Sequence, residues 1–277
     1  MISIIVCSRK DILSEELRQN ISDSVGAEYE LVVIDNSQNE YSIFSAYNEG
    51  VRRAKGDILC FMHEDVLFRS SGWGNRMVQY FDEDEKIGVI GFAGSHFLPA
   101  APMYWYSSPF ISQKNLNNDQ GVVKEHAHED WFAGRSIIEV VAVDGFCFFV
   151  RKSLFEHIRF DEATYSGFHL YDMDICMQVI KAGYKVCVCR DILAEHCWSQ
   201  KKLFTKEGSD LFTYNLNLFV DKWKSKKMLP IWRGLDLPVE MFQRVSRVYK
   251  QAYRNELASR SGFLRPVKRR IKKLLKK

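Results

Sequence analysis

Apolar residues occur in short runs, and the stretches between the runs have helical spacing. Runs at 2–6, 31–34, 57–62 and 87–92 are short and apolar, which predicts buried strands. Residues 41–55 place their apolar side chains near one helical stripe, which predicts a helix between the second and third runs. Strands that alternate with helices are typical of an α/β sheet whose strands are mostly parallel.

Capping residues set the expected ends of the helices. Asp11 or Ser14 can cap a helix that begins after the first run, since both side chains accept hydrogen bonds from free backbone N–H groups. Gly56 is expected to end the helix over 41–55, because glycine is common just past a last helical turn. The remaining helices that the pattern predicts are 72–81, a short one at 152–157, one beginning near Asp172, and 239–257.

Polar side chains follow two of the predicted strands. The second apolar run ends in Asp35 and Asn36, and the third ends in His63, Glu64 and Asp65. Open α/β sheets bind ligands at the carboxyl ends of their strands. A nucleotide base or ribose could be held at Asp35, and a metal-bound diphosphate at Asp65. The alternative for Asp35 is an Asx turn with no ligand.

Residues 93–137 break this rhythm with three prolines, an aromatic cluster and a polar run. We interpret the stretch as a long loop that forms a lid or an acceptor-facing insertion. It contains His126, His128, Glu129 and Asp130, whose spacing alone suits a metal. Their polar setting favours a solvated or acceptor-contacting segment instead.

The second half of the chain resumes the alternation with predicted strands at 138–143, 146–150 and 184–189. Asp172 and Asp174 fall at the start of a helix, where acidic residues can also merely complement the helix dipole. His196 follows in a predicted loop.

Composition allows one large α/β domain or two small ones, because 277 residues with 46% apolar content can bury a sizeable core. The seven cysteines show no repeated spacing, which favours free thiols in a reducing cytosol over a zinc ribbon. The N-terminus does not resemble a signal peptide, and no apolar run approaches the roughly 18 residues that span a bilayer. We therefore expect a cytoplasmic protein.

The net charge of +4 comes from the C-terminal end. Residues 263–277 hold eight Lys or Arg and no acid, so the remainder carries a net charge of −4. Apolar residues of this tail lie near one helical face, which suggests attachment to an anionic inner-membrane surface. A solvated tail and a nonspecific RNA contact are the alternatives. The acidic body argues against specific nucleic-acid binding.

Several short motifs, taken in order, resemble one family. The N-terminal ones are VVIDNS at 32–37, A-x-N-x-G at 46–50 and A-x-G-D at 54–57; the later ones are VDG at 143–145, Arg151, FDE at 160–162, GFH at 167–169, YDMD at 171–174, AGY at 182–184 and His196. Over roughly residues 1–200 the chain resembles GT-A family 2 glycosyltransferases. Its second half looks like the glycosyltransferase-like subgroup named after a streptomycin-biosynthesis protein.

The resemblance implies a mixed, mostly parallel GT-A sheet flanked by helices. A GT-A domain would cover 1–225, with a donor half at about 1–92 and an acceptor half at about 93–225. A helical basic extension would follow at 226–277. The family also implies a nucleotide-sugar donor, a divalent cation (Mn²⁺ or Mg²⁺), and a glycan or lipid-linked acceptor in bacterial surface polysaccharide or related biosynthesis.

Residue roles carry over by position. Asp172 matches the catalytic base, and Asp65 and His196 match the metal ligands. The residues expected to contact the donor are Ser8, Asp35, Asn36, His63, Glu64 and Asp144. The chain departs from the family where His63 replaces the first aspartate of the DxD element and Tyr171 replaces the glutamate of the ED motif.

The chemistry explains why such groups are needed. A departing nucleoside diphosphate is highly charged, and a hard cation held by few protein ligands neutralises it. Asp172 would take the proton of the attacking hydroxyl on the opposite face of the sugar, which inverts the anomeric carbon. The altered motifs leave two rivals. One is a GT-A-like binding protein without catalysis; the other is a nucleotidyltransferase, for which residues 7–10 form a poor phosphate loop.

Overall fold

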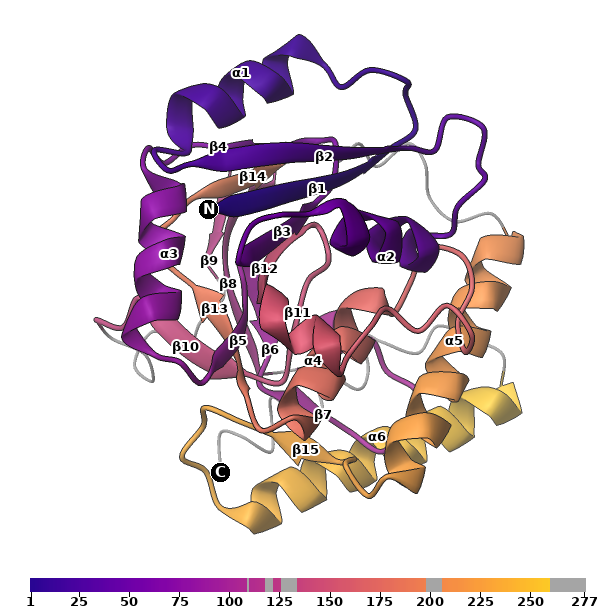
Figure 1. Ribbon diagram of the computed structural model, residues 1–277. Coiled ribbons are helices and arrows are strands. Elements are labelled where there is room, and N and C mark those ends of the chain that lie inside the picture. The colour runs from indigo at the N-terminus through magenta and orange to yellow at the C-terminus, as the bar shows by residue number, and fades with distance from the viewer. Residues whose placement is uncertain (109, 118–121, 126–133, 198–205, 260–277) are drawn as a thin grey trace.

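The structure is a computed structural model that describes residues 1–108, 110–117, 122–125, 134–197 and 206–259 (Figure 1). Within these residues the largest sheet has seven strands in the order β10-β13-β5-β12-β3-β1-β2. Five strands run in one direction, and β10 and β12 run in the other. The bounds are β1 (Ile2–Ser8), β2 (Tyr29–Asp35), β3 (Ile58–Met62), β5 (Ile87–Gly91), β10 (Ile137–Val140), β12 (Cys147–Arg151) and β13 (Lys185–Cys189).

The inner strands are apolar along their whole length because both faces of the sheet are covered. Every residue of β3 and β5 is buried, whereas β2, at the edge, buries only Val32 and Ile34. The strands expected at 2–6, 31–34, 57–62 and 87–92 are therefore confirmed.

Helices cover the sheet on both faces. In Figure 1, α1 lies along the upper edge, α3 lies beside β5, and α2 and α4 lie in front of the sheet. Ser14, rather than Asp11, caps α1, since its side chain accepts a hydrogen bond from the Leu17 N–H at 3.3 Å. The bounds are α1 (Glu15–Ser24), α2 (Ile43–Arg53), α3 (Trp73–Glu83) and α4 (Tyr171–Lys181).

Gly56 does not end α2 as predicted. The helix ends at Arg53, and Ala54 is already extended. Glycine is needed at 56 because a Cβ there would lie 2.6 Å from the Met1 carbonyl oxygen and 2.8 Å from the Ser3 nitrogen. The residue thus allows the chain to pass close to β1 before β3 begins.

Residues 93–137 were wrongly predicted to be one long loop. They contribute four strands, three of them to a six-stranded sheet with the order β11-β6-β8-β14-β4, in which β9 pairs with β8. The sequences of these strands show little alternation of apolar and polar residues. The strands form because they pair with distant segments, as β8 does with β14. The bounds are β4 (Val66–Phe68), β6 (Ala93–Ser95), β7 (Phe97–Leu98), β8 (Ile111–Asn117), β9 (Val122–Glu125), β11 (Ala142–Val143) and β14 (Ala194–His196). The cluster at 126–130 lies outside the described residues.

The single strand expected at 138–143 is divided between the two sheets. β10 pairs with β13 in the large sheet, and β11 pairs with β6 in the second. The break falls at Val141, whose N–H donates to the Ser95 carbonyl at 2.8 Å. His196 likewise ends strand β14 and does not lie in a loop.

The C-terminal elements are α5 (Lys206–Ser225), β15 (Ile231–Trp232) and α6 (Val239–Ser259), with short 3₁₀ turns η1 (Trp105–Ser107) and η3 (Lys152–Glu156) earlier in the chain. The helix expected over 239–257 is confirmed. Pro230 and Pro238, residues of a kind common in linkers, instead flank β15, which pairs with β7. Trp232 stacks on Phe242 of α6 in a small second core.

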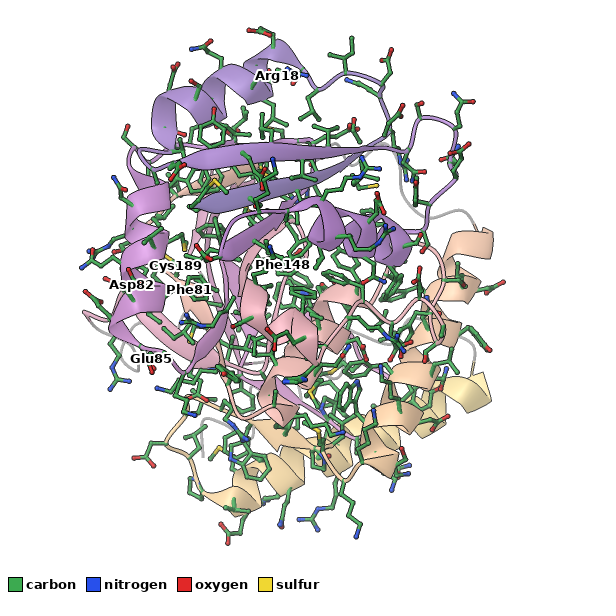
Figure 2. The ribbon with its side chains drawn as sticks, viewed as in Figure 1. Arg18, Phe81, Asp82, Glu85, Phe148 and Cys189 are labelled. Atoms are coloured by element: carbon green, nitrogen blue, oxygen red, sulfur yellow. The ribbon has the colours of Figure 1, made fainter. Side chains whose placement is uncertain are left out.

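Apolar side chains lie in the interior and charged side chains lie at the surface, as the hydrophobic pattern predicts. Figure 2 shows Phe148 and Phe81 inside the fold and Arg18, Asp82 and Glu85 at its outer surface. No helix in the described ranges is both long and apolar enough to cross a membrane. The basic tail at 263–277 lies beyond those ranges.

Candidate active site

The polar residues that follow the strands meet at one edge of the large sheet. Ser8 and Asp35 are register partners at the ends of β1 and β2. His63 follows β3, and its backbone N–H donates to the Phe146 carbonyl at 2.9 Å. This contact joins the end of β3 to the loop before β12, so the site takes residues from both halves of the chain.

Three side chains form a potential metal-binding group, which we call the His-Asp-His triad: His63, Asp65 and His196. One ligand atom from each lies within 4.8 Å of the others. His63 Nδ1 is 3.5 Å from His196 Nε2, and His196 Nε2 is 3.3 Å from Asp65 Oδ1. Pairing of β14 with β4 brings His196 to the turn that carries Asp65.

The charges of the triad suit a cation. Asp65 Oδ1 is buried and makes no hydrogen bond of good geometry within the described residues. Burial alone would raise the pKa of the Asp65 carboxyl, but the neighbouring imidazoles of His196 and His63 lower it. Burial, with His196 beside it, lowers the pKa of His63 to about 3. The Asp65 carboxylate and the neutral His63 imidazole therefore lie close enough together to bind one cation.

The His196 ring is held by packing. It stacks on Phe146 with ring centroids 5.0 Å apart and an angle of 13° between the planes. Two imidazoles and a carboxylate are suitable ligands for a divalent metal such as Mn²⁺. Because one ligand atom of each residue lies within 4.8 Å of the others, the residues present fit the cation that the resemblance implies.

Asp172, the expected base, lies in the first turn of α4 and is 2% exposed. Its Oδ2 accepts hydrogen bonds from the Tyr104 hydroxyl at 3.0 Å and the Gly145 N–H at 3.2 Å. Burial, reinforced by the charge of Asp144, raises the pKa of Asp172 to about 7. A carboxylate with a pKa near neutrality is well suited to accept a proton at physiological pH.

Asp144 is close enough to both the expected base and the triad to interact with their charges. Its Oδ1 accepts a hydrogen bond from the Phe146 N–H at 3.1 Å. Burial raises the pKa of Asp144, and His196 opposes that rise. Asp144 therefore interacts electrostatically with both Asp172 and His196.

The other expected donor contacts have local partners. Glu64 Oε2 accepts from the Ser8 hydroxyl at 2.6 Å and from the Arg9 N–H at 3.2 Å, which ties the loop after β1 to the turn after β3. The Asn36 side chain bonds both main-chain groups of Tyr41. Asp35 is exposed, and its Oδ1 accepts from the Ser37 N–H at 2.9 Å.

The Asp35 arrangement is the Asx turn considered as an alternative, and the Ser37 hydrogen bonds lower the pKa of Asp35. The turn leaves its second carboxylate oxygen available, so a turn and a ligand contact are compatible at this residue. The structure thus places Asp35 at the ligand-binding edge, and its contact with a donor remains a prediction.

Sequence reasoning missed the contacts of two tyrosines and the place of His63 in the triad. Tyr104 contacts the expected base, and the Tyr171 hydroxyl lies 2.8 Å from His63 Nε2 and 3.0 Å from the Gly145 carbonyl. His63, expected at the donor, belongs to the triad. Its position directly after a buried strand and two residues before Asp65 was a signal for this, because residues that follow parallel strands gather at the edge where α/β sheets bind ligands.

Comparisons with known proteins identify the family and the fold. A family model described as "Glycosyltransferase like family" matches residues 3–223. A search of curated protein sequences found no match. The chain is similar in fold to a structure of GalNAc-T7 with UDP, GalNAc and Mn²⁺, with a TM-score of 0.57 and 12% identity over 97% of this chain and 54% of that one.

A second similar structure is S. aureus TarS 1–349 in complex with UDP-GlcNAc, with a TM-score of 0.53 and 14% identity over 90% of this chain and 71% of that one. The chain spans about half the length of the GalNAc-T7 structure. At these identities the likeness shows the fold, which is the GT-A fold of glycosyltransferases. Because the family model covers most of its length, the chain belongs to the glycosyltransferase-like family.

Proposed function

We propose that the protein transfers a sugar from a nucleoside diphosphate donor to a glycan or lipid-linked acceptor, with a divalent cation and with inversion. The observation that carries the proposal is the His-Asp-His triad, in which the buried Asp65 Oδ1 lies 3.3 Å from His196 Nε2. It lies at the carboxyl edge of the sheet, where α/β folds bind nucleotides.

Different residues would bind the cation and accept the proton. Asp65, His63 and His196 would hold the cation, which, when bound, neutralises charge on the departing diphosphate. Asp172 accepts the proton of the acceptor hydroxyl, and the Tyr104 hydroxyl and Gly145 N–H orient its Oδ2. Attack from the side opposite the diphosphate inverts the anomeric carbon.

The donor class is supported from two sides. The similar structures contain UDP or UDP-GlcNAc, so we propose a nucleoside diphosphate sugar here too. Ser8, Glu64 and Asp35 line the ends of β1, β3 and β2, where such a nucleotide would lie. The order of the motifs from 143 to 196 supports placement in the streptomycin-related subgroup.

The acceptor side of the proposal depends on the basic tail. Residues 263–277 would bring the enzyme to an anionic inner-membrane surface, where a lipid-linked acceptor would be found. Vesicle flotation with and without anionic lipid tests this. Equal flotation of the full chain and a chain ending at 262 would contradict it.

A donor-hydrolysis panel tests the function itself. We expect release of nucleoside diphosphate from one nucleotide sugar, dependent on Mn²⁺ and lost in Asp65→Ala. Asp57→Ala is the matched control, because Asp57 lies at the opposite, amino end of β3 and is exposed. Binding without release, even with acceptors added, would favour a non-catalytic relative. Pyrophosphate release from a nucleoside triphosphate would favour the nucleotidyltransferase.

A further inference from the structure

We propose that Tyr171 is a positioning residue of the metal site: its hydroxyl holds His63 in the tautomer that presents Nδ1 as a ligand. The inference rests on the proposed function and deepens it. It gives a role to the residue that stands where the resembling family has a glutamate.

The direction of the hydrogen bonds follows from counting hydrogens. The Tyr171 hydroxyl lies 3.0 Å from the Gly145 carbonyl oxygen and 2.8 Å from His63 Nε2. A carbonyl oxygen only accepts, so the single hydroxyl hydrogen goes to Gly145. The contact with His63 is then satisfied only if Nε2 carries the hydrogen and donates it to the tyrosine oxygen.

A neutral imidazole with its hydrogen on Nε2 has a lone pair on Nδ1. That atom is the one that faces His196, at 3.5 Å from its Nε2. Metal-bound histidines commonly donate their other ring N–H to a fixed acceptor, which sets both tautomer and ring orientation. Tyr171 supplies such an acceptor, and the Gly145 carbonyl in turn fixes the hydroxyl.

The packing around Tyr171 admits its hydroxyl group at Gly145 and holds its ring in place. A Cβ on Gly145 would lie 2.3 Å from the Tyr171 hydroxyl oxygen, so glycine admits the hydroxyl. The Tyr171 ring packs edge-on against Tyr47 at 5.5 Å and lies 6.4 Å from Phe148. Tyr171→Phe would therefore keep the ring in place and remove only the hydroxyl.

Two measurements test the proposal. Long-range ¹H–¹⁵N NMR on the metal-free protein, with His63→Gln used to assign the signal, reads the tautomer directly. Mn²⁺ titration followed by EPR reads the affinity. We expect hydrogen on His63 Nε2 in the wild type and about 10- to 100-fold weaker Mn²⁺ binding in Tyr171→Phe. Tyr165→Phe is the control, since it also loses one buried hydroxyl contact, to Asp174.

The outcomes separate this inference from the function. Hydrogen on His63 Nδ1, or equal Mn²⁺ affinity in Tyr171→Phe and the wild type, would overturn the inference while the metal-dependent transfer stands. Failure of the wild type to bind Mn²⁺, with or without UDP, would overturn both. Equal weakening by Tyr165→Phe would show that the effect is general destabilisation and would also count against it.

Discussion

The first turn of α4 carries two buried aspartates whose surroundings differ sharply. Asp174 accepts hydrogen bonds from Tyr165, Trp223 and Lys222, at 2.8 to 3.0 Å, and Lys222 supplies a full positive charge. Asp172, two residues earlier, accepts hydrogen bonds within the described residues from the hydroxyl of Tyr104 and two backbone N–H groups, all neutral.

The different partners of the two aspartates indicate different roles. A buried carboxylate with a counter-charge and full hydrogen bonding stabilises the fold, and here it fastens α5 to α4. A buried carboxylate with a second acid nearby and no cation has a raised pKa, which suits proton transfer. We therefore assign Asp174 to the fold and propose Asp172 as the proton acceptor.

Replacement of the base has the largest expected effect. Asp172→Asn keeps the size of the side chain and removes the proton acceptor, so turnover should fall by about 10²- to 10⁴-fold with the fold retained. Nucleoside diphosphate release with the identified donor and acceptor measures this. Near-normal turnover would remove Asp172 from its role.

Replacement of the other aspartate should act on stability instead. Asp174→Ala leaves Lys222 without its most deeply buried partner, and we expect a loss of about 3–5 kcal/mol in the free energy of unfolding. Denaturant unfolding measures it. Adding Lys222→Met should recover part of the loss, since the charge that was stranded is then gone. A loss below about 1 kcal/mol would show that the ion-pair cluster is not what fastens α5.

Asp172 should also make stability depend on pH. The folded-state pKa of Asp172, about 7, lies above its ordinary value of 3.8, so the folded protein binds this proton more tightly than the unfolded chain. Stability should therefore fall as pH rises from about 4 to about 7, by at most about 4 kcal/mol. Thermal unfolding of the wild type and Asp172→Asn across this range measures the difference. Parallel curves would contradict the raised pKa.

The smallest expected effect concerns the loop after β1. Glu64→Gln keeps the shape but weakens acceptance of the Ser8 and Arg9 hydrogen bonds, which should cost about tenfold in nucleotide affinity. Titration calorimetry with the identified nucleotide measures it. Glu83→Gln on the outer side of α3 is the control, because Glu83 is exposed and away from the sheet edge.

Local patterns predicted the large sheet and the position of most site residues. The apolar runs of β1, β3 and β5 are unambiguous because both faces are buried, and acids that follow such runs must meet at one edge. The second sheet could not be predicted, because β6 pairs with β11 and β8 pairs with β14, both of which lie far along the chain. Local propensity does not encode such pairing.

In the site too, local motifs predict some residues and contacts with distant segments determine others. Asp65, His196 and Asp172 were predicted from their motifs, whereas the Tyr171–His63 contact joins residues 108 positions apart. The contrast between Asp172 and Asp174 also arises from distant residues, since Lys222 and Trp223 come from α5. Sequence spacing placed both acids on one helix, and only tertiary packing distinguishes them.

The most direct measurement of the metal-assisted nucleotide site is a thermal-shift panel of nucleotides and nucleotide sugars, with and without Mn²⁺, on the wild type and Asp65→Ala. A ligand that binds only the folded state raises the melting temperature by mass action. At a ligand concentration one hundred times Kd, the free energy of unfolding increases by about 2.7 kcal/mol. We expect one nucleotide class to stabilise the wild type, more so with Mn²⁺, and Asp65→Ala to lose the Mn²⁺-dependent part. No shift with any nucleotide, or an equal shift in Asp65→Ala, would contradict the proposed site.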